Sequence, residues 1–210
     1  MEIEVKLRLP DSTAHQSLSS VLSPFLLHTH HQHNLFFDSV ASHLSSRRAV
    51  LRLRFYGDHL ATAARCVASL KAKAIIVDGV SRVEEDEEEL DPGTGRAIWV
   101  DPSLIGSTTG SRVLVRVREE FGIEGNEYVC LGGFKNVRRV YEWSGLKLEL
   151  DETTFDFGTL YEVESETGEP EKAKELIEGL LRKNGIAYSY STMSKFAIFR
   201  SGKLPMIQNE

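Results

Sequence analysis

Met1-Glu2-Ile3-Glu4-Val5-Lys6-Leu7-Arg8-Leu9 alternates strictly after its first residue, with charged side chains at even positions and apolar side chains at odd positions. Side chains of a β-strand point to opposite faces with a period of two, so this stretch predicts a strand with one charged face. The apolar face must pack on a core. The charged face of a single strand usually meets water.

The same alternation returns in four later stretches, each with charged side chains at i and i+2 and apolar residues between them. These stretches are residues 51–55, 70–74, 147–151 and 161–164. A chain that repeatedly gives one strand face both basic and acidic side chains is expected to enclose a charged interior. The alternative is that each strand exposes its charged face to solvent separately. We favour the charged interior.

Composition limits the classes of protein to consider. A chain of 210 residues with 41% hydrophobic and 27% charged residues is typical of a globular domain. A net charge of -6 argues against general nucleic-acid binding through a basic surface. Cys66 and Cys130 lie far apart in the chain without metal-type spacing, which favours a reducing compartment. We therefore expect a cytoplasmic monomer without a leader segment or membrane contact, with one domain over residues 1–200 and a loose tail at 201–210.

Local signals predict the secondary structure. Capping residues and apolar stripes indicate helices at residues 12–21, 111–121, 172–184 and 191–199, and a short helix beginning at 101–103. Strands are expected at residues 1–9, 34–38, 51–55, 67–73, 127–131, 134–143, 146–150 and 160–165. Loops or turns are expected at residues 57–58, 78–79, 91–95, 132–133 and 144–145.

Two polar stretches leave alternatives open. Four histidines at residues 28–33 invite a metal site, but their spacing favours a polar strand or hairpin edge. Residues 84–89 are all acidic, so they form either a solvated run or a strand with two acidic faces. In the second case we favour Glu85, Glu87 and Glu89 as the inward face.

About eight antiparallel strands with helices between them predict a mainly β, α+β fold, a closed eight-stranded antiparallel barrel with a narrow charged interior. Buried charges need partners of opposite charge. Basic side chains could bind a polyanion, and carboxylates could bind hard divalent cations, so this mixture predicts a site for both. The inward basic set is Lys6, Arg52, Arg54, Lys71, Lys73, Lys147 and one of Arg138 or Arg139. The inward acidic set is Glu2, Glu4, Glu149, Asp151, Glu162 and Glu164, with Glu85 and Glu87 as further candidates.

These residues resemble a known family. Glu2-Ile3-Glu4-Val5-Lys6 is similar to the Glu-x-Glu-x-Lys signature at the N-terminus of the CYTH superfamily, also called triphosphate tunnel metalloenzymes. Supporting segments follow in order along nearly the whole chain. They are Asn34-x-x-Phe37-Asp38, residues 51–54, Leu70-Lys71, the acidic strand near Glu85, residues 147–151, residues 162–164 and Ser194-Lys195. The compact length looks most like that of the small plant-type inorganic tripolyphosphatases.

The resemblance implies an eight-stranded tunnel enzyme that hydrolyses tripolyphosphate with one or two Mg²⁺ or Mn²⁺ ions. Alternatives in the same tunnel are a nucleoside, RNA or thiamine triphosphatase, an adenylyl cyclase, or a binder of polyphosphate without activity. Nucleic acid would enter only as a 5'-triphosphate end. The implied phosphate ligands are Lys6, Arg52, Arg54, Lys71, Lys73, Arg138, Lys147 and Lys195. The implied metal ligands are Glu2, Glu4, Glu85, Glu87, Glu149, Asp151, Glu162 and Glu164, and Glu2, Glu4 and Lys6 would take part in catalysis. Period-two counting from Lys135 favours Arg139 over Arg138, whereas the resemblance favours Arg138.

Overall fold

A computed structural model describes residues 1–205, apart from the side chain of residue 126. Its strands are β1 (Glu2–Leu9), β2 (Leu26–Ser39), β3 (Ala49–Tyr56), β4 (Arg65–Val77), β5 (Val80–Leu90), β6 (Tyr128–Trp143), β7 (Leu146–Phe155), β8 (Gly158–Glu166) and β9 (Ser189–Tyr190). They form one sheet in the order β5-β4-β3-β2-β6-β7-β8-β1-β9, and β5 also pairs with β1. That additional pairing closes the order of the eight long strands into the expected antiparallel β-barrel.

The chain divides into two compact units. The first unit comprises Met1–His30, Ile75–Arg82 and Asn136–Glu210, and the second comprises His31–Ala74 and Val83–Lys135. Among residues 1–205, no helix combines the length and the hydrophobicity that crossing a membrane requires. The loose tail expected at residues 201–210 does not start at residue 201, because Ser201 is the last residue of a helix. Residues 206–210 lie outside the described part of the chain. The single-domain boundary at residue 200 stays a prediction.

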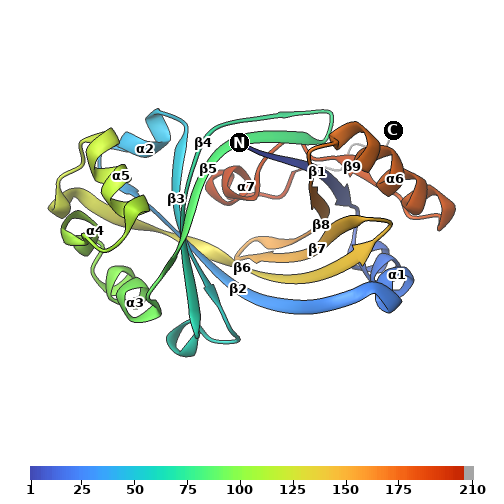
Figure 1. The fold of residues 1–210 in the computed structure, drawn as a ribbon, viewed down its shortest axis with the longest axis horizontal. Helices are drawn as coiled ribbons and strands as arrows, with labels where there is room; N and C mark the ends of the chain where they lie inside the picture. Colours follow the sequence, from blue (N-terminus) through green and yellow to red (C-terminus); the bar gives the residue numbers. More distant parts are fainter. Residues whose placement is uncertain (206–210) are drawn as a thin grey trace. The chain divides into compact units, whose positions relative to one another are not determined.

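The first unit packs its own core beneath α1 (Ser12–Leu22) and α6 (Pro170–Lys183), and it also contains α7 (Lys195–Ser201). Figure 1 shows α6 alongside β1, where the two elements are in contact. The apolar side of β1 contributes Val5, Leu7 and Leu9, which are at most 2% exposed and pack with Ile177 and Leu181 of α6. The alternation of the first nine residues is therefore confirmed as one face on a core and one charged face.

The second unit packs a separate core beneath α2 (His43–Ser46), α3 (Pro92–Val100), α4 (Leu104–Ser107) and α5 (Arg112–Phe121). Helix α3 corrects the expected loop at residues 91–95. Asp91 caps it by accepting a hydrogen bond from the backbone N–H of Thr94, Pro92 stands at the helix start, and Ile98 is fully buried. In the sequence, the pair Asp91-Pro92 is the signal that could have predicted the start of this helix.

Strand β6 corrects the expectation of two strands separated by a break at residues 132–133. It runs without interruption through Gly132 and Gly133. A Cβ atom at Gly133 would lie 1.7 Å from the backbone oxygen of Asn34 on β2. Gly133 therefore permits a close backbone approach within a strand, although the Gly-Gly pair in the sequence resembles a turn signal. The two-residue strand β9 was also not anticipated, whereas the histidine stretch forms part of β2, as the polar-strand reading predicts.

Candidate active site

Charged side chains from β1 and β8 face one another in the first unit. The register of the two strands places Lys6 opposite Glu164 and Arg8 opposite Glu162. The Lys6 ammonium lies 2.9 Å from Glu164 Oε1 and 2.6 Å from Glu4 Oε2. Glu4 and Glu164 are 7% and 2% exposed, so these ion pairs belong to the interior of the unit.

Arg138 of β6 joins this group and resolves the choice between Arg138 and Arg139. Its Nε and Nη2 donate to the two oxygens of Asp151 at 2.8 and 2.6 Å, and Nη2 also donates to Glu164 Oε2 at 2.7 Å. A further ion pair joins Arg138 to Glu149. Arg139 lies on the other side of the strand, where its Nη1 is 3.5 Å from Nε2 of His15.

Lys195 enters the same group from the first turn of α7. Ser194 caps that helix by accepting a hydrogen bond from the backbone N–H of Ala197. The Lys195 ammonium lies 2.5 Å from Glu164 Oε1, 2.9 Å from Asp151 Oδ2 and 3.0 Å from Glu162 Oε2. One lysine thus contacts carboxylates from β7 and from two positions of β8. We call Glu4, Lys6, Arg138, Glu149, Asp151, Glu162, Glu164 and Lys195 the ionic cluster.

The ionic cluster favours the charged forms of Glu164 and Lys6. Burial alone would raise the pKa of Glu164, but Lys195, Lys6 and Arg138 lower that pKa well below its usual value. Burial would lower the pKa of Lys6, but Glu164, Glu4 and Glu162 raise it well above the ordinary lysine value. At neutral pH Glu164 and Lys6 therefore form a charged pair inside this unit.

Arg8 and Ser191 were missed as site residues. Arg8 is 6% exposed, and its Nη2 donates to Glu162 Oε1 at 3.3 Å. Ser191 is fully buried, and its hydroxyl donates to the same oxygen at 2.6 Å. The period-two pattern that selects Lys6 also selects Arg8 as the next position on the same face. Ser191 had no sequence signal, because it follows the unanticipated β9.

The second unit brings together another set of the predicted residues. Arg52 of β3 lies 3.6 Å from Glu85 Oε1, and Lys71 of β4 lies 3.1 Å from Glu85 Oε2. The Arg54 Nε group donates to the side-chain oxygen of Asn34 at 2.9 Å. Burial and the neighbouring charge of Arg54 lower the pKa of Arg52 to about 10. Among the described residues, Arg52 Nε and Glu85 Oε1 are buried without a hydrogen-bond partner, which leaves polar atoms available to a ligand.

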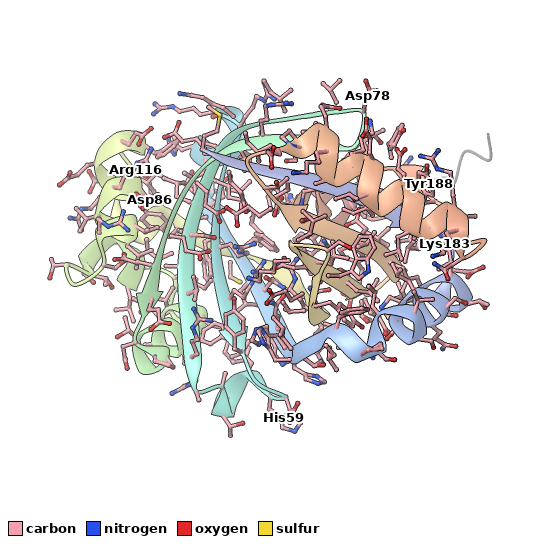
Figure 2. The ribbon with its side chains drawn as sticks, turned by 45° about the vertical axis from the view of Figure 1, so that its right-hand side comes forward. His59, Asp78, Asp86, Arg116, Lys183 and Tyr188 are labelled. Carbon is pink, nitrogen blue, oxygen red and sulfur yellow. The ribbon has the colours of Figure 1, made fainter. Side chains whose placement is uncertain are left out.

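Strand β5 presents its acidic residues on two faces, as alternation requires. Glu85 faces Arg52 and Lys71, the side favoured from the sequence, whereas Glu84 and Asp86 face α5. Figure 2 shows Arg116 of α5 beside Asp86, and the Arg116 Nη1 group lies 3.3 Å from Asp86 Oδ2. These ion pairs connect the outer face of β5 to α5, whereas Glu85 lies on the opposite face of the strand. Glu87 is 49% exposed and only 3.8 Å from Arg52, so it lies at the margin of the inner set.

Three predicted residues do not join these groups in the way that alternation implies. Lys73 has a φ of 55°, which interrupts the strand geometry, and its side chain is 79% exposed and pairs with Glu84. Lys147 is 63% exposed and lies 3.6 Å from Glu149. The inward facing expected for Lys73 is therefore wrong, whereas Lys147 keeps the face of Glu149 but has an exposed side chain at the start of β7. Glu2 is half-buried at the start of β1, where it helps to raise the pKa of Glu166 after the larger effect of burial.

A model of the CYTH domain matches residues 1–197. The chain belongs to the CYTH domain family. Among solved structures, it is 56% identical to HpAC1 from Hippeastrum, over 98% of each chain and with a TM-score of 0.94. That protein is named as a candidate adenylyl cyclase and has a dominant triphosphatase activity. A candidate adenylate cyclase from Bacillus halodurans is 20% identical over 95% of this chain and 97% of that chain, with a TM-score of 0.70, and shows the shared fold alone. No curated protein matches the chain.

The CYTH resemblance implies a divalent cation, and the donor chemistry of the ionic cluster fits one. Carboxylate oxygens are the ligands that Mg²⁺ and Mn²⁺ prefer, and Glu4, Asp151, Glu162 and Glu164 supply them from buried positions. In residues 1–205, however, no three His, Cys, Asp or Glu side chains converge as a metal-binding group. The carboxylates are instead held by Lys6, Arg138 and Lys195. A cation could bind here only by exchanging with one of these ammonium or guanidinium partners.

Proposed function

We propose that this CYTH protein hydrolyses inorganic tripolyphosphate to pyrophosphate and orthophosphate in a reaction that depends on Mg²⁺ or Mn²⁺. The observation that carries the proposal is the ionic cluster, in which carboxylates and cations from four strands and α7 alternate in a buried space. A pure anion-binding site would not need the carboxylates. The dominant triphosphatase activity of the Hippeastrum protein, at 56% identity, supports the same reaction.

Hydrolysis transfers one phosphoryl group to water. A water oxygen attacks the terminal phosphorus, the bond from that phosphorus to the bridging oxygen breaks, and pyrophosphate leaves with the electron pair. The water proton passes to a carboxylate, for which we propose Glu4 or Glu2, and then to solvent. Such a reaction needs in-line positioning and neutralisation of the phosphate oxygens more than covalent chemistry by the protein.

The cations would orient the substrate. Lys6, Arg138 and Lys195 have donor groups in the ionic cluster, and we propose that they exchange their carboxylate partners for phosphate oxygens when substrate binds. In the second unit, we propose that Arg52, with its neighbours Arg54 and Lys71, binds phosphate oxygens, because the buried Nε of Arg52 has no hydrogen-bond partner among the described residues. Arginine suits this role, since its N–H groups match phosphate oxygens in pairs. The exposure of Lys73 and Lys147 supports no such role for them.

The carboxylates would hold the metal. We propose Glu4, Asp151, Glu162 and Glu164 as its ligands, with Glu2 and Glu149 at the margin and with Glu85 and Glu87 as candidates in the second unit. When bound, the cation supplies charge neutralisation on phosphate oxygens and lowers the pKa of a coordinated water.

A second candidate is a reaction on a nucleotide, because the Hippeastrum protein carries the name of an adenylyl cyclase beside its triphosphatase activity. The two candidates differ in products. Cyclisation of ATP releases pyrophosphate and cyclic AMP, whereas hydrolysis of tripolyphosphate releases orthophosphate and pyrophosphate.

The test is a substrate panel of tripolyphosphate, ATP and thiamine triphosphate, each with Mg²⁺, with Mn²⁺ and with excess chelator, followed by product analysis. We expect orthophosphate release to be fastest with tripolyphosphate, to stop with chelator, and to return when Mg²⁺ exceeds the chelator. Release that continues undiminished in chelator would contradict the metal, and cyclic AMP as the main product would favour the second candidate.

The free thiols of Cys66 and Cys130 support our further proposal of a cytoplasmic location, which fractionation of cells would test. A monomeric state remains our proposal as well, and light scattering at several protein concentrations would check it.

A further inference from the structure

The two oxygens of Glu162 have different partners. Oε1 accepts hydrogen bonds from the Ser191 hydroxyl at 2.6 Å and from Arg8 Nη2 at 3.3 Å. Oε2 lies 3.0 Å from the ammonium of Lys195. The side chain is 1% exposed, so bulk solvent has almost no access to either oxygen. One oxygen is therefore fixed by neighbours outside the ionic cluster, and the other is presented to the cluster.

Arg8 is held in place for this contact by its strand. It lies directly opposite Glu162 in the β1–β8 register, and its guanidinium is nearly fully buried. Within the described chain, its Nε is buried without a hydrogen-bond partner. A buried guanidinium with an unsatisfied N–H costs stability, so Arg8 is not explained as a simple packing residue. Its Nη2 group forms an ion pair with Glu162 Oε1 at 3.3 Å.

Ser191 connects the same carboxylate to the backbone of Lys6. Its backbone N–H donates to the Lys6 carbonyl at 3.2 Å, while its hydroxyl donates to Glu162. The Lys6 N–H in turn donates to the carbonyl of Gly79 at 2.6 Å. Ser191 is thus fixed by the strand that carries Lys6, and its hydroxyl has a defined direction.

We infer that Arg8 and Ser191 are positioning residues that hold the Glu162 carboxylate by Oε1, so that Oε2 is pre-oriented toward the cation that replaces Lys195. The inference rests on the proposed function in taking that cation to be Mg²⁺ or Mn²⁺. Partners that orient a metal ligand typically change metal affinity or activity by about 10- to 100-fold when they are removed. Neither residue is expected to touch the triphosphate.

The experiment measures Mg²⁺ and Mn²⁺ binding by calorimetry on the full chain without substrate, and separately the Mg²⁺ concentration that gives half-maximal phosphate release. The variants are Ser191→Ala, Arg8→Met and Arg8→Lys. Ser165→Ala is the matched control for serine, because Ser165 is also fully buried but its hydroxyl donates to the Lys147 carbonyl. Arg139→Met is the control for arginine, because Arg139 contacts His15 outside the ionic cluster.

We expect Ser191→Ala and Arg8→Met to weaken Mg²⁺ binding about 10-fold and to raise the half-maximal Mg²⁺ concentration by a similar factor. Arg8→Lys should recover part of the loss, and both controls should bind Mg²⁺ like the wild type. If Arg8→Met does not fold, Ser191→Ala and Arg8→Lys decide the question.

Wild-type affinity in Ser191→Ala and in the Arg8 variants would overturn the inference, and so would a wild-type protein that binds neither Mg²⁺ nor Mn²⁺. A wild-type protein that binds Mg²⁺ but releases no phosphate would contradict the proposed function, while calorimetry on the variants would still decide the positioning role.

Discussion

Arg138 and Asp151 form a two-point pair, in which Nε and Nη2 of the guanidinium donate to the two carboxylate oxygens at 2.8 and 2.6 Å. Asp151 has no exposed surface, and the same guanidinium also bonds to Glu164. Parallel hydrogen bonds fix the plane of both groups. Arg138 therefore sets the orientation of two carboxylates from different strands.

Replacing Arg138 should be costly for stability as well as for activity. Arg138→Met leaves Asp151 and Glu164 with one fewer buried partner each, and breaking a buried ion pair typically costs about 3–5 kcal/mol. We expect a loss of this size in the free energy of unfolding, measured by urea denaturation. Arg139→Met should lose less than about 1 kcal/mol, since its neighbour is a histidine. Equal losses in the two variants would show that Arg138 has no special structural role.

Glu4→Gln should lower metal-dependent hydrolysis by about 100-fold or more, because the amide keeps the shape but removes a charge from the ionic cluster. The melting temperature should stay near or above that of the wild type. Lys6 retains Glu164 at 2.9 Å, so its ammonium does not become unpaired. Initial rates with tripolyphosphate and a thermal melt provide the two measurements, and full activity in this variant would remove Glu4 from the site.

Ile3→Asp tests the opposite face of the same strand. Ile3 is half-buried, between the charged neighbours Glu2 and Glu4. A carboxylate there should loosen β1, so that activity falls indirectly and the melting temperature falls clearly below that of Glu4→Gln. If Ile3→Asp melts and reacts like the wild type, packing of this face does not matter for the site.

His15 should make stability depend on pH between about 4 and 6.5. Burial and the charge of Arg139 lower its pKa from 6.5 to about 4. In that interval the unfolded chain binds the proton and the folded chain does not, so stability falls as pH decreases from 6.5. Between pH 6.5 and 5 we expect the loss to be about 1 kcal/mol after allowing for solvent screening, or roughly 2–4 °C in melting temperature.

His15→Gln should flatten this profile from pH 5 to 6.5. Glu164 has a lowered folded pKa, so its contribution is lost only as pH falls below its usual value of about 4.5. That loss should remain in the variant at lower pH. An unchanged slope above pH 5 would show that His15 is not the responsible group.

Gly133→Ala should destabilise the chain by about 3 kcal/mol, because the added Cβ would lie 1.7 Å from the Asn34 oxygen and both groups belong to backbones of paired strands. The matched control is Gly179→Ala in α6, where nothing lies within 4 Å of the added atom. That change should be neutral or stabilising by about 0.5–1 kcal/mol. Urea denaturation of both variants measures the difference.

The sequence was most informative where a strand keeps regular geometry. Alternation from Glu4 to Lys6 correctly predicts that both side chains point into the ionic cluster. The same alternation continues to Arg8, although Arg8 was not among the predicted site residues. At Lys73 the same rule fails, because a left-handed backbone conformation turns that side chain out of the alternation. Local periodicity contains no information about such a conformation.

Residues that depend on long-range contacts were less accessible from the sequence. Ser191 becomes a partner of Glu162 only because the short β9 pairs with β1, and a two-residue strand has no pattern of its own. For Arg138 and Arg139, counting from Lys135 gave the wrong face across a long strand, whereas the resemblance to the CYTH family favoured Arg138. Both cases depend on tertiary register, which neighbouring residues do not determine.

The composition of the ionic cluster has a consequence for how substrate arrives. Glu4, Glu149, Asp151, Glu162 and Glu164 supply five negative charges, and Lys6, Arg138 and Lys195, together with Arg8, supply four positive ones. Four positive and five negative charges leave this group with a net charge of -1, so it does not attract a bare polyanion at a distance. A triphosphate that already carries a divalent counter-ion brings a charge for the carboxylates at the same time as oxygens for the lysines and arginines. Under the metal-dependent reaction that we propose, substrate binding would exchange ion-pair partners at nearly constant charge, and the divalent cation would be part of what the site recognises.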